Sequence, residues 1–259
     1  MLLSCVEHML GGRSLTEKLA IVRAAGFDGI DVRWSTLADP AARGVLADSD
    51  LPIGALYSQM RDPCLLAARA EERARAVEGL VERAEAAVAI GAPTLIVVPI
   101  FGPAKLRGFD PLFDVEQIET ALLLATLTEL AERVANLPVT ITIEPLNHDQ
   151  THFLVEPAKA AKLCAAIGAP LIATMVDTYH CEREGQDIIA QIEATGDKLD
   201  LVHLSDTDRK LPGEGTIDFG PVLAALRARN YDGWMGFEGR VVDDPADLAR
   251  SVAYIRGLT

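Results

Sequence analysis

Short apolar runs alternate with longer amphipathic stretches along the whole chain. The runs are rich in β-branched residues and apolar on both faces, which is typical of parallel strands buried between helices. They predict strands at Leu2–Glu7, Gly29–Trp34, Pro52–Ser58, Thr94–Ile100, Thr140–Leu146, Leu171–Thr178, Leu199–Asp206 and Gly233–Gly239. Apolar positions at helical spacing predict helices at Ser14–Ala25, Leu37–Ala47, Leu65–Ile90, Asp114–Asn136, Glu156–Ile167, Gln186–Ala194, Phe219–Arg229 and Pro245–Arg256.

Eight strand–helix units follow one another in a chain of 259 residues. This number and size predict an α/β fold, a single-domain (β/α)8 TIM barrel spanning residues 1–259. The alternative is a doubly wound open sheet, whose nucleotide-binding form has a G-x-G-x-x-G turn after its first strand. The sequence at that point is EHMLGGRS, which lacks this spacing. The barrel is therefore the favoured architecture.

Each of the last four predicted strands carries, near its carboxyl end, a side chain of a type that can bind a metal ion. These side chains are Glu144, Asp177, His203 and Glu238. In a barrel, the carboxyl ends of the strands open onto one mouth, where active sites lie. Three carboxylates and one neutral imidazole suit one Mn²⁺ ion per chain, with Mg²⁺, Co²⁺ or Zn²⁺ as alternatives. Singly, each could be a helix cap or a satisfied core residue, but four consecutive strand ends favour a metal site.

Composition restricts the partners and the compartment. The formal net charge of −14 argues against a nucleic-acid partner, because such binding depends on clustered Lys and Arg. No apolar window reaches the length of about 18 residues that suggests a membrane span. The N-terminal segment MLLSCVEHML has no basic region before an apolar one, so no signal peptide is expected. The four cysteines show no C-x-x-C spacing, which indicates reduced thiols of a cytoplasmic protein.

Several short segments resemble one enzyme family. The segments IEPLN, VDTYH, HLSDTDR, PGEGTIDF and GFEG are similar to those of the xylose isomerase-like TIM-barrel superfamily, and within it to ketohexose 3-epimerases and hydroxypyruvate isomerases. The spacings of 33, 26 and 35 residues between the four expected metal ligands agree with the ketohexose 3-epimerase pattern. His180 and Arg209 also match family positions. The resemblance is close in the second half of the chain and only architectural in the first.

The resemblance implies a metal-dependent isomerase or epimerase of a small keto sugar or hydroxy-keto acid, acting through an enediolate. Glu144 and Glu238 would be the catalytic pair, in which one carboxylate removes a proton and the other returns it. His180 and Arg209 would bind substrate oxygens, and Asp206 would orient Arg209 or the metal-binding histidine. The resemblance also implies a homo-oligomer.

The loop after the fifth predicted strand departs from the ketohexose epimerases. Those enzymes carry a Glu six residues after the first metal-binding Glu, where this chain has Gln150. An amide forms hydrogen bonds but takes up no proton in this pH range. Gln150 and His148 are therefore candidates for substrate binding. His148 and His152 either replace the missing proton relay or simply belong to the loop.

Three other functions are compatible with parts of this pattern. A lyase, dehydratase or decarboxylase of a keto sugar acid would use the same site, and Gln150 together with the basic Lys105 and Arg107 motivates that alternative. A DNA-repair endonuclease of the same fold would need several zinc ions, many histidines and a basic groove. Five histidines and a net charge of −14 argue against it. A non-catalytic sugar-binding protein would not need both candidate catalytic glutamates.

Overall fold

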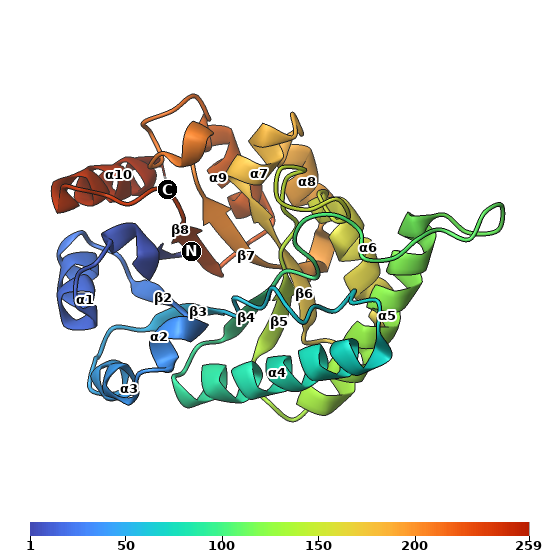
Figure 1. The fold of residues 1–259 in the computed structure, drawn as a ribbon. Coiled ribbons are helices and arrows are strands. Elements are labelled where there is room, and N and C mark those ends of the chain that lie inside the picture. The colour runs from blue at the N-terminus through green and yellow to red at the C-terminus, as the bar shows by residue number, and fades with distance from the viewer. Residues whose placement is uncertain (259) are drawn as a thin grey trace.

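Eight parallel strands close into a barrel in the computed structural model, which describes residues 1–258 (Figure 1). The strands are β1 (Leu2–Val6), β2 (Gly29–Arg33), β3 (Ile53–Tyr57), β4 (Thr94–Val97), β5 (Thr140–Ile143), β6 (Ile172–Asp177), β7 (Leu199–Leu204) and β8 (Trp234–Phe237). Each strand pairs with its neighbour in the sequence, and β8 pairs with β1 to close the barrel. The predicted (β/α)8 TIM barrel is confirmed. The predicted boundary at residue 259 lies outside the described residues.

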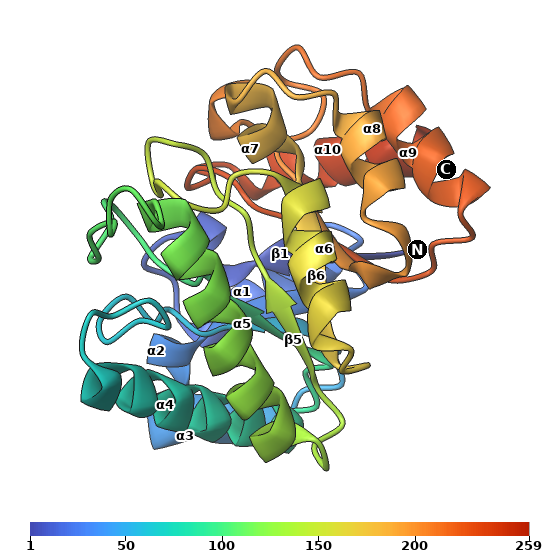
Figure 2. The same cartoon turned by 90° about the vertical axis from the view of Figure 1, so that its right-hand side faces the viewer.

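Helices surround the barrel. They are α1 (Leu15–Ala24), α2 (Trp34–Leu37), α3 (Pro40–Ala47), α4 (Ala70–Ala89), α5 (Val115–Val134), α6 (Pro157–Ile167), α7 (Thr178–Arg183), α8 (Ile188–Ala194), α9 (Phe219–Ala228) and α10 (Pro245–Leu258). Three short 3₁₀ turns lie at Glu7–Leu10, Gly196–Lys198 and Thr207–Arg209. Figure 2 shows α4, α5 and α6 following one another around the outside, where neighbouring helices contact each other.

Local sequence signals explain where several helices begin. The Ser14 side chain accepts the Glu17 amide hydrogen, and the Glu17 carboxylate accepts that of Ser14, which completes a capping box before α1. Asp114 and Gln117 form the corresponding pair before α5. Such reciprocal bonds satisfy amide groups that have no partner inside the helix, so the starts of these helices follow directly from the sequence.

Some predicted boundaries were wrong. The helix predicted at Leu65–Ile90 begins only at Ala70, because the residues before it form a loop whose leucines are buried against the barrel. The helix predicted at Leu37–Ala47 is split, since Pro40 lacks an amide hydrogen and starts a new helix after the Asp39 cap. The strand predicted to end at Thr178 ends one residue earlier, and the short helix α7 follows it at once.

The core has an outer and an inner part. The larger cluster lies between the barrel and the helices and includes Leu80, Leu127 and Phe237, which are all fully buried. A small cluster of Ala55, Ile96, Met175 and Leu201 fills the barrel interior, with Tyr57 and Trp234 packed against it. These side chains fill the barrel below its mouth.

Within residues 1–258, no helix combines the length and apolar character that a membrane crossing requires.

Candidate active site

The carboxyl ends of β5 to β8 bring four metal-type side chains to one point. Glu144 directly follows β5, Asp177 is the last residue of β6, and His203 lies in β7. Glu238 directly follows β8. One ligand atom of each residue lies within 4.8 Å of those of the others. The register of the sheet contributes to this convergence, because Asp177 lies opposite His203.

The imidazole of His203 is oriented toward the carboxylates. Its Nδ1 lies 3.3 Å from Glu238 Oε2 and 3.8 Å from both Glu144 Oε1 and Asp177 Oδ2. This nitrogen is buried and has no hydrogen-bond partner within the described chain. Its Nε2 lies 3.0 Å from the Tyr57 hydroxyl. If Nε2 carries the proton and donates it to Tyr57, the lone pair of Nδ1 is left free for a cation.

The pKa values at this cluster show a concentration of negative charge. Burial and the charge of Glu238 raise the pKa of Glu144 to about 8. Burial also opposes ionisation of Glu238, but Arg209 and His203 lower the pKa of that carboxyl to about 2. The pKa of His203, which burial alone would lower, is raised to about 10 by the carboxylates around it. Buried carboxylates at this separation, together with an unpartnered Nδ1, fit a divalent cation, which would let all three ionise.

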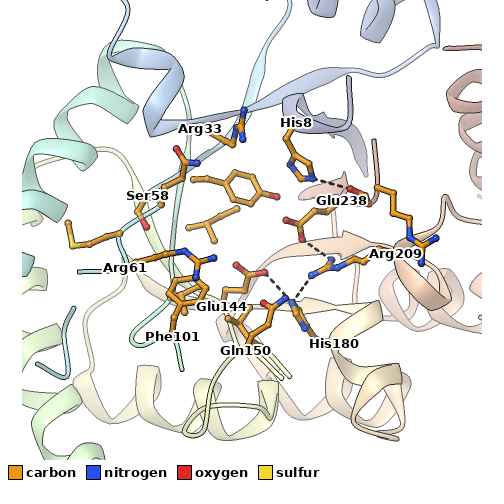
Figure 3. Close-up of a pocket in the computed structure, with 18 residues that line it drawn as sticks. His8, Arg33, Ser58, Arg61, Phe101, Glu144, Gln150, His180, Arg209 and Glu238 are labelled. Atoms are coloured by element: carbon orange, nitrogen blue, oxygen red, sulfur yellow. Dashed lines mark hydrogen bonds and ion pairs between the residues drawn. The ribbon is translucent and has the colours of Figure 1, made fainter. Parts of the chain in front are cut away.

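Arg209 and His180 lie beside the cluster and line the cavity in front of it (Figure 3). Arg209 Nη1 donates to Asp177 Oδ2 at 2.7 Å and to Glu238 Oε2 at 2.9 Å. The Nδ1 of His180 accepts the amide hydrogen of Asn147, which fixes the ring. Its Nε2 lies 2.8 Å from Arg209 Nη2 and 4.0 Å from Glu144 Oε1. The structure therefore places two of the four predicted substrate-binding residues, His180 and Arg209, next to the two predicted catalytic glutamates.

Two expectations from the sequence find no support in the geometry. His148 does not line the cavity; its side chain is 62% exposed and its Nδ1 lies 2.5 Å from Glu184 Oε2. Asp206 does not orient His203 or Arg209 through its carboxylate. Instead, that carboxylate accepts four amide hydrogens of the following loop, from Thr207, Gly213, Gly215 and Ile217. Both side chains satisfy nearby loop groups, a preference that strand-end position alone does not reveal.

The loop after β5 reaches the cavity through Gln150. Gln150 lines the cavity, and its carbonyl accepts the amide hydrogen of Gly102 at 2.7 Å. His152 is held away from the cavity, with Nδ1 2.9 Å from the Gly102 carbonyl and Nε2 2.6 Å from the buried carboxylate of Glu119. These contacts join the loops after β4 and β5. His152 thus belongs to the loop framework, whereas Gln150 faces the space where a substrate would lie.

The first half of the barrel supplies the other wall of the cavity, which has a volume of about 460 Å³. The residues of this wall include Tyr57, Phe101, His8, Arg33 and Arg61. Arg240, which follows β8, also lines the cavity. Sequence reasoning did not single out the three arginines. Arg33 is a polar residue at the carboxyl end of an apolar strand, as the metal-type residues are. A search for polar side chains at the end of β2 would therefore have found it. Arg61 and Arg240 lie in loops without a periodic pattern.

A buried carboxylate lies inside the barrel below the cluster. Asp31 in β2 is fully buried, and its Oδ2 accepts the hydroxyl hydrogen of Ser4 at 2.7 Å. Burial raises the pKa of Asp31 to about 6, although Ser4 and His203 oppose the rise. A Cβ atom at Gly54 would lie 2.5 Å from Asp31 Oδ1, and one at Gly236 would lie 2.7 Å from Asp31 Oδ2. The space for this carboxylate therefore depends on two glycines.

A model of the xylose isomerase-like TIM barrel family matches residues 19–258. The chain belongs to this family. The chain is similar to 3-dehydro-D-guloside 4-epimerase of Escherichia coli K12, with 25% identity over 249 residues covering 94% of both proteins. The chain is also 27% identical to L-ribulose 3-epimerase of Mesorhizobium japonicum over 256 residues, covering 94% of this chain and 82% of that protein. The resemblance inferred from the short segments is thus confirmed.

A solved structure agrees with this membership at the level of the fold. The crystal structure of 3-keto-D-glucoside 4-epimerase from Escherichia coli matches with a TM-score of 0.85 and 23% sequence identity, covering 99% of each chain. The similarity extends over the whole barrel, including the first half, where the sequence segments gave only an architectural likeness.

Proposed function

We propose that this protein is a divalent-metal-dependent isomerase or epimerase of a small keto sugar or hydroxy-keto acid. The observation that carries the proposal is the placement of Glu144 and Glu238 on the wall of one cavity, in the same cluster as Asp177 and His203. The two relatives compared above are named as sugar epimerases, which supports the same general activity for this protein.

Two carboxylates at one substrate site provide a base and an acid for proton transfer. Glu144 and Glu238 come from β5 and β8, which are not neighbouring strands, so their carboxylates approach the cavity from different directions. One removes the proton from the carbon next to the carbonyl, and the other returns a proton to the opposite face or to the adjacent carbon. The first outcome is epimerisation and the second is isomerisation.

Glu144, Asp177, His203 and Glu238 would hold the cation. A bound divalent ion would polarise the substrate carbonyl and stabilise negative charge on its oxygen. Oxygen-rich sets with one imidazole suit Mn²⁺, so we propose one Mn²⁺ ion per chain. Arg209 contributes a fixed positive charge, and His180, whose Nε2 lies 2.8 Å from Arg209 Nη2, lines the cavity beside it, so this pair would bind a substrate hydroxyl. Gln150 would hydrogen-bond a further hydroxyl without exchanging protons.

Elimination or decarboxylation of a keto sugar acid is not favoured. The chemistry of the cluster would allow it, but the relatives compared above are named as epimerases. Lys105, which motivated that alternative, pairs with Asp62 and is absent from the cavity lining, as is Arg107. The proposal therefore remains with reactions that rearrange the substrate without loss of water or carbon dioxide.

We also propose a homo-oligomer located in the cytoplasm. The loop before α5 projects away from the barrel (Figure 1) and exposes the apolar side chains Phe109, Leu112 and Phe113. Such a patch favours contact with another protein surface. Light scattering after gel filtration should give a multiple of the chain mass, and Phe109→Ser should lower the measured mass.

The proposed cytoplasmic location rests on the cysteines. Four buried free cysteines support a reducing compartment.

Solvent exchange tests the proposed chemistry directly. Protein loaded with Mn²⁺ is incubated in D₂O with ketohexoses and small hydroxy-keto acids, and deuterium incorporation beside the carbonyl is followed by NMR. Incorporation is expected with the wild-type protein, together with a new isomer of unchanged carbon number. Glu144→Gln and Glu238→Gln should each remove it, whereas Glu85→Gln, an exposed position on α4, should not. Exchange that persists in both cavity variants would refute the proposal.

A further inference from the structure

Three arginines give the cavity a charge opposite to that of the whole chain. Arg33, Arg61 and Arg240 line it, although the chain carries a formal net charge of −14. At the metal-type cluster, the three carboxylates would be balanced by Arg209 and a divalent cation. The other charged side chains of the lining are thus the three arginines. The part of the cavity away from the cluster is therefore positively charged before any substrate enters.

Arg61 is the arginine best placed to meet a substrate. Figure 3 shows its side chain pointing into the cavity, beside Phe101 and on the side away from Arg209. Its guanidinium carbon lies 4.1 Å from the centre of the Phe101 ring. No carboxylate of residues 1–258 forms an ion pair with it, and the adjacent Asp62 is bound by Lys105 at 3.1 Å. Stacking on the ring orients the guanidinium and leaves its N–H edges free.

Arg33 adds a second unbalanced charge at the edge of the cavity. The Nε atom of Arg33 lies 3.7 Å from Glu7 Oε1. This atom is buried and makes no hydrogen bond to any described residue. The Glu7 carboxylate is already bound by the buried Lys18 at 3.2 Å and by the amide of Arg33 itself at 2.9 Å. Because Lys18 balances Glu7, the charge of Arg33 remains available to a ligand.

The loop after β7 indicates which anion this charge would accept. In barrels that bind phosphate, the backbone amides after the seventh and eighth strands commonly hold it. Here the amides of Gly213, Gly215 and Ile217 are already bonded to the Asp206 carboxylate, at 2.9 to 3.0 Å. The charged donors that remain in the lining away from the cluster are guanidinium groups, whose planar edge matches the two oxygens of a carboxylate, while these amides after β7 are not available to a phosphate.

We infer that the substrate is a keto sugar acid whose carboxylate is bound by Arg61 and Arg33, at the end of the molecule remote from the reacting carbonyl. The inference rests on the proposed isomerase or epimerase function and narrows its substrate class. Neutral keto sugars would leave Arg61 without an anionic partner and Arg33 with only the Glu7 carboxylate that it shares with Lys18. Arg240, which is exposed, would add long-range attraction at the mouth of the cavity.

A matched set of substrates tests this inference. The Mn²⁺-loaded protein is assayed with a ketohexose, with its 6-phosphate, and with the keto hexuronate in which a carboxylate replaces the terminal hydroxymethyl group. Charge-assisted hydrogen bonds predict that kcat/KM for the uronate exceeds that for the neutral sugar by at least about tenfold. Arg61→Gln should lower this ratio by about tenfold or more, and Arg75→Gln, an exposed position on α4, should leave it unchanged.

Equilibrium binding gives a second measurement that needs no turnover. Calorimetric titration with gluconate and with glucitol, which differ only in the carboxylate, should show tighter binding of gluconate to the wild-type protein. That preference should be lost in Arg61→Gln. If gluconate binds equally well to the wild-type protein and to Arg61→Gln, the carboxylate is bound by the cation and the inference is wrong.

The remaining outcomes separate the two proposals. A preference for the neutral sugar, or a uronate preference that survives in both Arg61→Gln and Arg33→Gln, overturns the inference while the isomerase or epimerase function stands. A preference for the 6-phosphate overturns the assignment to a carboxylate. If no compound exchanges deuterium or is isomerised, the proposed function fails, and the gluconate titration still decides whether the arginines bind a carboxylate.

Discussion

The two halves of the barrel perform different tasks at the same mouth. The half formed by β5 to β8 carries Glu144, Asp177, His203 and Glu238, so it supplies the groups that would hold a metal and move a proton. The half formed by β1 to β4 and the loops beyond it supplies Tyr57, Phe101, Arg33 and Arg61, which form the facing wall. Under the proposed function, the half with the metal-type cluster would determine the reaction type, and the facing wall would determine whether the substrate carries a charge. A change in one half should alter one property far more than the other.

The largest effect should follow from removal of a metal ligand. Asp177→Asn keeps a side chain that caps α7 but exchanges a charged ligand for a neutral amide. We expect loss of Mn²⁺ binding and a fall in kcat of at least about a thousandfold, because the cation and its two catalytic carboxylates act as one unit. Metal content by mass spectrometry and the rate of isomerisation measure this.

Thermal unfolding provides the control for that variant. Mn²⁺ at about 100 times its Kd should stabilise the wild-type protein by about 2.7 kcal/mol. Asp177→Asn should show no such shift, and its Tm without metal should be lower than that of the wild-type protein because the buried ion pair with Arg209 is lost. If Asp177→Asn is stabilised by Mn²⁺ to the same extent, the four-residue cluster is not the metal site.

Tyr57 connects the two halves, so its variant should have a smaller effect. Tyr57→Phe removes the hydroxyl that lies 3.0 Å from His203 Nε2 and leaves the ring stacked on the imidazole. Partners of this kind contribute about 10-fold to 100-fold in metal affinity. We expect Mn²⁺ affinity to fall within that range, measured by competition with a chelating dye. An unchanged affinity would mean that Tyr57 only packs against His203.

A variant of Asp31 should change the stability of the fold in a pH-dependent way. The Asp31 pKa of about 6 in the fold exceeds the ordinary value of 3.8, so the folded state binds more protons than the unfolded state between these values. The contribution of Asp31 to the free energy of unfolding of the metal-free protein should therefore fall as the pH rises from 4 to 6. At pH 7, Asp31→Asn should restore about 3 kcal/mol, and near pH 4 it should have little effect. Urea unfolding at a series of pH values measures this; equal effects at both pH values would contradict it.

The smallest effect is expected at His148. Its imidazole is largely exposed and its contact is with Glu184, outside the cavity. Surface ion pairs of this kind contribute at most about 1 kcal/mol. His148→Ala should change kcat/KM by less than about threefold. Gln150→Ala, two residues further along the same loop, should raise KM clearly because Gln150 lines the cavity. A strong loss in His148→Ala would indicate that this loop closes over the substrate.

The sequence was most informative where backbone periodicity and chemistry coincide. Parallel strands end at one mouth by necessity, so Glu144 and Glu238 could be placed together before any coordinates existed. His180 and Arg209 came from family resemblance, and both lie beside the cluster. His148 shows the limit of such reasoning. Its position in the chain is near the mouth, but the neighbouring carboxylate of Glu184 turns its side chain elsewhere.

The facing wall could not be predicted in the same way. Arg61 lies in a loop between β3 and α4, where no repeat of apolar positions indicates which way a side chain points. Its direction depends on stacking with Phe101 from the loop after β4. Asp206 was assigned to the wrong partners for a related reason, since its role depends on a turn that returns Gly213 and Gly215 to it. Contacts between loops are set by tertiary structure and leave little trace in local sequence.

The carboxylate of Asp31 has a consequence for how this barrel can vary. The side chain occupies room that exists only because Gly54 on β3 and Gly236 on β8 lack a Cβ. A mutation to alanine at either glycine collides with the acid, and a mutation of the acid alone leaves a gap. Repacking the floor of the mouth with apolar groups therefore requires coordinated changes at three positions. Stepwise evolution or single-site libraries would seldom reach that alternative.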